Sequence, residues 1–156
     1  MMTHRSPGTH NPGNPSLHVR IPPDARHART VRDALIAFSS LHSIDPRDVE
    51  ALLFAIGEAL ANAIEHGAPE IDIDVTVEIE QAAIYARVVD RGKGLLALPE
   101  PIAPLPDGLT ERGRGIPIMQ RCVDLVEVSS TPGEGTAVSL TRYRRSHTNQ
   151  EARAIS

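Results

Sequence analysis

Aromatic residues are scarce in this sequence, which has two Phe, two Tyr and no Trp among 156 residues. Proteins that bind single-stranded nucleic acid stack the bases on aromatic side chains, and this composition argues against such a platform. The formal net charge of −4 and the pI of about 5.9 provide no bulk attraction to nucleic acid or to acidic lipids. We therefore expect neither a direct nucleic-acid partner nor a membrane partner.

Cysteine and long apolar runs are scarce as well. The single cysteine, Cys122, excludes an intramolecular disulfide, and a reducing cytoplasm fits best. No apolar run reaches the roughly 18 residues of a membrane-spanning helix. The N-terminal MMTHRSPGTHNPGNP has no apolar stretch that could serve as a secretory signal. The composition, 40% hydrophobic and 23% charged, predicts one globular cytoplasmic domain with a core of ordinary size.

Lysine is almost absent, because Lys93 is the only one among 16 Lys and Arg residues. A P-loop needs a lysine before its Ser or Thr, and a eukaryotic-type protein kinase needs one on a strand. The segment GLTERGRG at 108–115 has the P-loop spacing, but Arg114 replaces the lysine and Gly115 replaces the hydroxyl residue. If this protein binds ATP, it must use a different kind of site.

The hydrophobic pattern predicts a single domain at residues 15–144 with the order β-α-α-β-β-loop-α-β-β. The expected strands are 16–22, 71–80, 82–90, 125–131 and 136–144, the helices are 24–41, 45–66 and 116–124, and the loop is 91–112. Polar segments flank the domain: 1–14 is expected to be a disordered tail, and 145–156 is a polar C-terminal tail. Short turns between strands predict an α+β two-layer sandwich, with a mixed, mostly antiparallel sheet and its helices on one face.

The helix expected at 45–66 contains two polar residues, Glu58 and Asn62, in the otherwise apolar sequence GEALANAIEHG. They differ by only about 40° around the helix and roughly 6 Å along it. The opposite side carries the stripe expected to pack on the sheet: Val49, Leu52, Leu53, Ile56, Leu60, Ala63 and Ile64. One interpretation is that Glu58, Asn62 and Glu65 simply form the solvated face of the helix.

A second interpretation is that this helix is covered on both sides and admits the two polar groups for chemistry. The far side adds the apolar residues Ala51, Phe54, Ala55 and Ala61. Asn is also a poor residue for a helix interior, because its side chain competes for backbone hydrogen bonds. An amide oxygen is a hard ligand suited to Mg²⁺, and a carboxylate one turn away can orient or deprotonate a nucleophile.

A glycine motif follows the expected strand at 82–90. In VVDRGKGL, Asp90 ends the strand, and Gly92 and Gly94 follow at alternate positions. A carboxylate at a strand end can accept a hydrogen bond from an exocyclic amine such as that of adenine, and glycines let the backbone pass close to a ligand. Alone, this motif is only suggestive, because glycine-rich turns after strands are common.

Two further glycine motifs lie nearer the C-terminus. GRGIPIM places Gly113 and Gly115 before a short helix, whose first backbone N–H groups form an anion site. GEGTAVSL places Thr136 at the start of the final strand. Taken singly, the second is better explained as a hairpin turn followed by an ordinary strand threonine.

In this order, the four elements resemble the GHKL ATPase fold shared by gyrase, Hsp90, histidine kinases and MutL. E-x-x-x-N at 58–62 looks like its N box, D-x-G-x-G at 90–94 like its G1 box, G-R-G at 113–115 like its G2 box, and G-T at 135–136 like its final motif. EALANAIEHG and GRGIPIMQRCVDLVEV are similar specifically to bacterial anti-sigma-factor serine/threonine kinases of the RsbW and SpoIIAB type. The resemblance covers residues 16–143.

The resemblance implies a role for each matching residue. Asn62 would ligate Mg²⁺, and Glu58 would be the general base for a serine hydroxyl. Asp90 would bind the adenine amino group, with Thr136 supporting it through water. The glycines that would shape the ATP pocket are Gly92, Gly94, Gly113 and Gly115, with residues 95–112 as the ATP lid. We add Arg114 as a phosphate-binding guanidinium and His66, one turn after Asn62, as a residue that could line the site.

Three functions are open at this point. The first is an anti-sigma factor kinase that binds a sigma factor and phosphorylates a STAS-type anti-sigma factor antagonist, with a homodimer expected from the family. The second is a non-catalytic module in which Mg-ATP sets the affinity for a protein partner. The third is a scaffold that binds no nucleotide. Histidine kinases carry an F box and a separate phosphoacceptor domain, and neither is found here, which argues against that branch.

Overall fold

The computed structural model describes residues 9–92 and 115–145. These residues form one sheet with the strand order β1-β2-β3-β5-β4, in which all four strand pairings are antiparallel. The strands are β1 (Ser16–Ile21), β2 (Ile73–Ile79), β3 (Ala83–Asp90), β4 (Leu125–Thr131) and β5 (Gly135–Tyr143). The helices are η1 (Ala25–His27, a 3-10 turn), α1 (Ala28–Leu41), α2 (Pro46–His66) and α3 (Gly115–Cys122).

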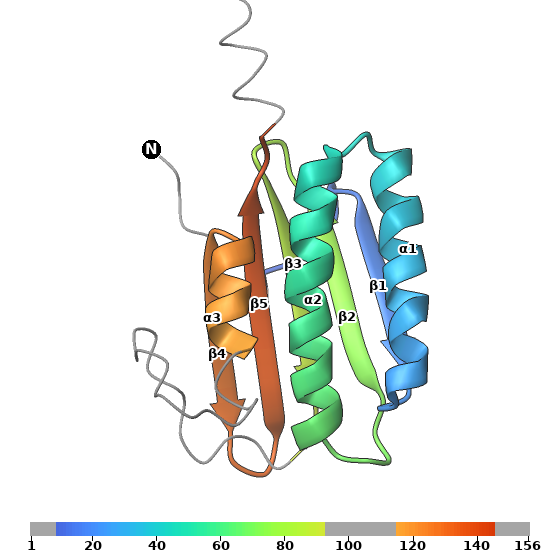
Figure 1. Cartoon of the computed structure of the whole chain (residues 1–156), viewed down its shortest axis with the longest axis vertical. Helices are drawn as coiled ribbons and strands as arrows, with labels where there is room; N and C mark the ends of the chain where they lie inside the picture. The colour runs from blue at the N-terminus through green and yellow to red at the C-terminus, as the bar shows by residue number, and fades with distance from the viewer. Residues whose placement is uncertain (1–8, 93–114, 146–156) are drawn as a thin grey trace, which may run out of the picture.

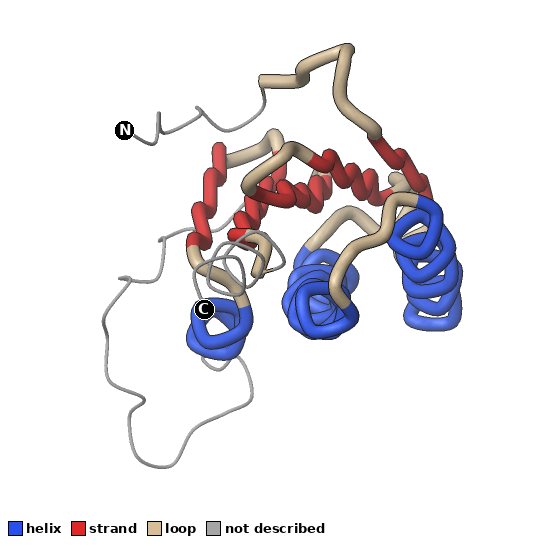
Figure 2. Tube along the Cα trace, turned by 90° about the horizontal axis from the view of Figure 1, so that it is seen from above, coloured by secondary structure: helices blue, strands red, loops and turns tan. Residues whose placement is uncertain are grey.

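All three α-helices cover the same face of the sheet, as Figures 1 and 2 show. The α2 helix runs between α1 and α3 and packs against both. The expected α+β two-layer sandwich is therefore confirmed, with a sheet that is antiparallel throughout the described strands. Within this part of the chain, no helix is long and apolar enough to cross a membrane.

Local sequence signals set the helix boundaries. The Asp45 carboxylate accepts a hydrogen bond from the Arg47 backbone N–H at 2.8 Å, and Pro46 occupies the first turn, so α2 begins as predicted. It ends at His66, with Gly67 as its C-cap. Asp24 is also a cap, but of the η1 turn rather than of α1, which begins three residues later than the η1 turn.

The core lies between the sheet and the helices. Leu52, Ile56 and Leu60 of α2 are buried in one cluster with the inward-facing residues of β2, β3 and β5. These strand residues are Ile73, Val75, Val77, Ile79, Ile84, Ala86, Val88, Val138 and Leu140. Every second residue of each strand thus faces the helices, which is the period-two burial expected for a strand with one packed face.

The outer face of the sheet is less open to water than the alternation of β2 suggests. Glu78 points to this face, yet only 8% of it is exposed. Its carboxylate accepts a hydrogen bond from Asn14 Nδ2 at 2.8 Å and lies 3.0 Å from His10 Nδ1. Residues 9–14 thus contact the outer face, whereas residues 1–8 and 146–156 lie outside the described residues. Residues 9–14 are therefore not the free tail that the sequence predicted, whereas the disorder of residues 1–8 and the domain limits stay predictions.

The expectation that α2 is covered on both sides is wrong for the described chain. Phe54 is 60% exposed, and Gly57 and Ala61 are exposed as well. The reason is architectural: in two layers, a helix between two neighbours still leaves its ridge opposite the sheet uncovered. The alternative of a fully solvated polar face is also too simple, because Glu58 and Asn62 are half-buried while Glu65 is exposed.

Candidate nucleotide site

A buried carboxylate stands at the end of β3. Asp90 is only 7% exposed, and its Oδ1 accepts a hydrogen bond from the Gly92 backbone N–H at 3.0 Å. This short turn leaves the second carboxylate oxygen, Oδ2, without a hydrogen bond among the residues that the structure describes. A carboxylate oxygen without a hydrogen bond from the protein can accept one from a ligand or from water. Asp90 is therefore arranged to accept a hydrogen bond from a ligand donor.

A row of hydroxyl groups extends from Asp90 across the sheet. Thr136 of β5 pairs directly with Asp90, and Ser130 of β4 pairs directly with Thr136. Directly paired residues of antiparallel strands place their side chains on the same face. Ser130 Oγ lies 3.1 Å from Thr136 Oγ1 and also donates to the Gly135 carbonyl oxygen at 3.4 Å. Carboxylate and hydroxyls thus form one polar line on the helix-covered face.

The end of α2 lies close to the end of β3, and glycines occupy the points of closest approach. A β-carbon on Gly92 would lie 2.6 Å from Gly67 Cα and 2.7 Å from the His66 carbonyl oxygen. A β-carbon on Gly67 would lie 3.2 Å from Asp90 Cβ. On Gly135, whose φ is +109°, it would lie 2.6 Å from Arg91 Cα. The ends of α2 and β3 and the start of β5 therefore converge, and only glycine allows this approach.

The predicted pair on α2 lies within the last three turns before that convergence. Glu58 and Asn62 are one turn apart, half-buried, and without a hydrogen bond or ion pair inside residues 9–92 and 115–145. Half-buried polar groups without a protein partner are available to a ligand. The predicted His66 contributes its backbone to the contact with Gly92, while its Nε2 lies 3.8 Å from Glu65 Oε2.

The remaining predicted residues are only partly described. Gly115 is the first residue of α3. Gly94, Gly113, Arg114 and the lid 95–112 lie outside the described residues. Ser130 was not predicted from the sequence, although the register of the hairpin formed by β4 and β5 places it beside Thr136. In the described part, no group of three or more His, Cys, Asp or Glu residues could hold a metal ion.

Residues 21–142 match the pattern of the histidine kinase-like ATPase domain. The chain belongs to this family. Because the family is one of ATPase domains, membership implies that the domain binds ATP. The GHKL-type fold that the four sequence motifs predicted is thereby confirmed.

Curated relatives place this ATPase domain with the anti-sigma factors. The chain is 34% identical over 123 residues to the anti-sigma F factor of Thermoanaerobacter sp. (strain X514), a match covering 74% of this chain and 82% of the relative. It is 31% identical over 114 residues to the anti-sigma F factor of Bacillus subtilis (strain 168), covering 67% and 77%. The predicted resemblance to this branch of the ATPase domain family is therefore confirmed.

Solved structures agree on the fold. The crystal structure of the RsbU and RsbW domains of Rv1364c from Mycobacterium tuberculosis superposes with a TM-score of 0.65 at 26% identity, covering 84% of this chain. This ATPase domain spans 33% of that longer chain. The histidine kinase domain from Erythrobacter litoralis EL346 matches with a TM-score of 0.50 at 15% identity, over 80% of this chain and 62% of that one, which is a likeness in fold alone.

Proposed function

We propose that this protein is an anti-sigma factor serine/threonine protein kinase. It binds Mg-ATP, phosphorylates a serine on an anti-sigma factor antagonist of the STAS type, and sequesters a sigma factor. One observation carries the proposal: the buried carboxylate of Asp90 and the hydroxyl row beside it lie against the end of the helix whose Glu58 and Asn62 have no protein partner within the described chain.

The adenine end of the nucleotide suits the chemistry of Asp90. Its Oδ1 is engaged by the Gly92 N–H, so the second oxygen is available for an exocyclic amino group, which is a donor. The hydroxyl of Thr136 lies next in the row and can hold a water between itself and the base. Ser130 holds the Thr136 hydroxyl in place from β4. Together these groups would favour adenine, because guanine presents a carbonyl acceptor at the position of that amine.

The phosphate end suits the pair on α2. Mg²⁺ usually keeps several waters and takes few protein ligands besides the substrate phosphates. One amide oxygen from Asn62 is therefore enough protein contact, which fits a site without a cluster of carboxylates in the described chain. Glu58 would accept the proton of the serine hydroxyl as general base. ATP supplies a phosphoryl group whose transfer depends mainly on positioning and charge neutralisation.

The proposed partners are inferred from the names of the relatives and not from a binding surface on this chain. The relatives are anti-sigma F factors, whose name states that they act on a sigma factor. We extend this to a sigma factor and a STAS-domain antagonist for the present chain, acting in the cytoplasm, and to a homodimer as the assembly. Gly94, Gly113 and Arg114 would complete the nucleotide contacts, and they stay predictions.

A phosphotransfer assay with labelled ATP and a purified STAS-domain antagonist tests the proposal. We expect Glu58→Gln to abolish transfer while Mg-ATP binding stays, because the base acts only on the attacking hydroxyl. Glu50→Gln is the matched control, since Glu50 is an exposed glutamate of the same helix. Full activity of Glu58→Gln would remove the proposed base. Partner affinity that changes with ATP, without any transfer in the wild type, would select the non-catalytic ATP-gated module instead.

A further inference from the structure

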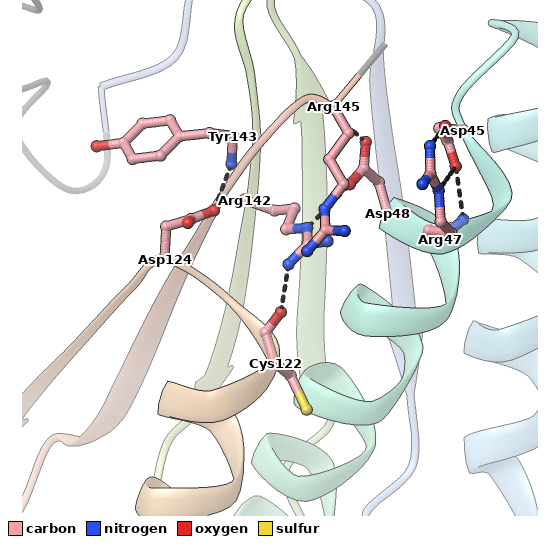
Figure 3. A network of polar contacts seen from close by, with 8 residues as sticks. All are labelled: Asp45, Arg47, Asp48, Cys122, Asp124, Arg142, Tyr143 and Arg145. Atoms are coloured by element: carbon pink, nitrogen blue, oxygen red, sulfur yellow. Dashed lines mark hydrogen bonds and ion pairs between the residues drawn. The ribbon is translucent and has the colours of Figure 1, made fainter. Parts of the chain in front are cut away.

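A buried ion pair lies at the opposite end of α2 from the nucleotide site. Asp48 is fully buried and Arg142 is 9% exposed. Arg142 Nε donates to Asp48 Oδ1 at 2.9 Å, and a second guanidinium nitrogen, Nη1, donates to the Cys122 carbonyl oxygen at 2.9 Å. The second carboxylate oxygen accepts from the Arg145 backbone N–H at 3.0 Å. Figure 3 shows these contacts around the Arg142 guanidinium and the Asp48 carboxylate.

Each partner belongs to a different element that leads to the nucleotide site. Asp48 lies in the first turn of α2, Cys122 is the last residue of α3, and Arg142 lies near the end of β5. A carboxylate at the start of a helix and a cation at the end of another both complement the helix dipoles. One planar side chain thus joins the beginning of α2, the end of α3 and the sheet, in directions fixed by its fork of donors.

The other ends of these three elements carry the residues assigned to the nucleotide. The eight residues of α3 span about 12 Å back to Gly115, and α2 runs on to Glu58 and Asn62. The segment of β5 from Arg142 back to Thr136 spans about 20 Å. Because helices and strands of this length behave as rigid bodies, an anchor at one end sets where the other end lies.

We propose that Arg142 is a positioning residue for the nucleotide site. Its guanidinium fixes α3 relative to α2, and it thereby sets the distance between the start of α3 and the Glu58–Asn62 pair. This inference rests on the proposed Mg-ATP site. The role is distinct from stabilising the fold, because a buried ion pair can often be replaced by apolar residues with no loss of stability.

An experiment can separate the positioning role of Arg142 from a role in stability. Arg142→Met alone leaves Asp48 as a buried charge with no cation beside it, and this variant could fail to fold. The double variant Asp48→Leu with Arg142→Met replaces the pair by apolar side chains and removes the directional link to Cys122. We expect its Tm within about 5 °C of the wild-type value, whereas the calorimetric Kd for Mg-ATP rises about tenfold. Arg142→Lys keeps the charge but not the fork, and we expect an intermediate rise.

The matched control is the pair Arg20 and Asp74 on the outer face of the sheet. It has the same Nε to Oδ1 distance of 2.9 Å, and Arg20→Met with Asp74→Leu should leave the Kd unchanged. Wild-type Kd in a folded double variant would overturn the positioning role and leave the proposed function intact. If the double variant does not fold, Arg142→Lys decides: an unchanged Kd in this variant overturns the role. A wild-type chain that binds no Mg-ATP would overturn both.

Discussion

Replacing Gly135 by alanine tests the convergence of β3 and β5 at the nucleotide site. The glycine has a φ of +109°, and a β-carbon there would overlap the Asp90 carbonyl oxygen and lie 2.6 Å from Arg91 Cα. Gly133 of the same turn has a φ of +82°, but a β-carbon on it would meet nothing within 4 Å. The two substitutions therefore share the backbone strain and differ in the steric overlap.

The expected cost can be estimated for each variant. A positive φ destabilises the folded state of an alanine variant by about 1–2 kcal/mol. Alanine also reduces the conformational entropy of the unfolded chain, which offsets about 0.4–1 kcal/mol of that loss. Gly133→Ala should therefore lower the free energy of unfolding by about 1 kcal/mol. Gly135→Ala adds an overlap with backbone atoms that cannot rotate away, which brings about 1–3 kcal/mol more. The total for Gly135→Ala is then about 3 kcal/mol.

Urea denaturation measures this difference directly. With a slope of about 1.5 kcal/mol/M for a domain of this size, Gly135→Ala should lower the urea midpoint by about 2 M, and Gly133→Ala by less than about 1 M. Gly135→Ala should also weaken ATP binding, because the overlap pushes on Asp90. Equal midpoints for the two variants would refute the close approach of β5 to the end of β3.

Three further predictions concern other parts of the molecule. Leu52→Ala should lower the free energy of unfolding by about 2–4 kcal/mol, whereas Phe54→Ala, on the exposed ridge of α2, should change it by less than about 0.5 kcal/mol; similar losses in urea melts would place Phe54 in a covered interface. Ser130→Ala removes the partner of the Thr136 hydroxyl and should raise the Kd for ATP about fivefold, measured by calorimetry; an unchanged Kd would exclude the hydroxyl row from binding. The Arg47 side chain holds the pKa of Asp45 at about 2, below its ordinary 3.8. The contribution of this charge is therefore present above pH 4 and lost as the pH falls toward 2, so Asp45→Asn should be less stable at pH 7 and match the wild type near pH 2. A stability difference that does not change between pH 7 and pH 2 would exclude the charge as its cause.

The secondary structure could be predicted from the sequence because its signals are local. Asp45 followed by Pro46 marks the start of α2, and Gly67 marks its end. The alternation in β2 and β3 and the turn before β5 are similarly contained within a few residues. Short connections between the strands then leave few arrangements besides an antiparallel sheet with helices on one face.

Features that depend on distant contacts could not be predicted. Arg142 and Asp48 are 94 positions apart, and neither looks unusual in its own segment. The burial of Glu78 depends on residues 9–14, which have the composition of a free tail. Phe54 was misplaced because an apolar residue on the far side of a helix has the same local pattern whether a third layer covers it or not.

The residues of the candidate site could be selected from the sequence for a different reason, and their roles stay predictions. Glu58 and Asn62 are polar residues in apolar surroundings, and Asp90 ends an apolar strand directly before a glycine motif; such exceptions are visible in the sequence before any fold is known. Ser130 was not visible in this way, because it is one of two serines in an ordinary strand. Only the register of β4 against β5 distinguishes it from Ser129, which faces the other side.

Calorimetric titration of ATP into the purified chain, with and without Mg²⁺, tests the central claim most directly. We expect saturable binding that strengthens with Mg²⁺, loses its Mg²⁺ dependence in Asn62→Ala, and weakens strongly in Asp90→Asn, while Glu50→Gln binds as the wild type does. The absence of ATP binding by the folded wild-type chain would contradict the account. If Asn62→Ala and Asp90→Asn both bind ATP as tightly as the wild type does, the nucleotide lies elsewhere.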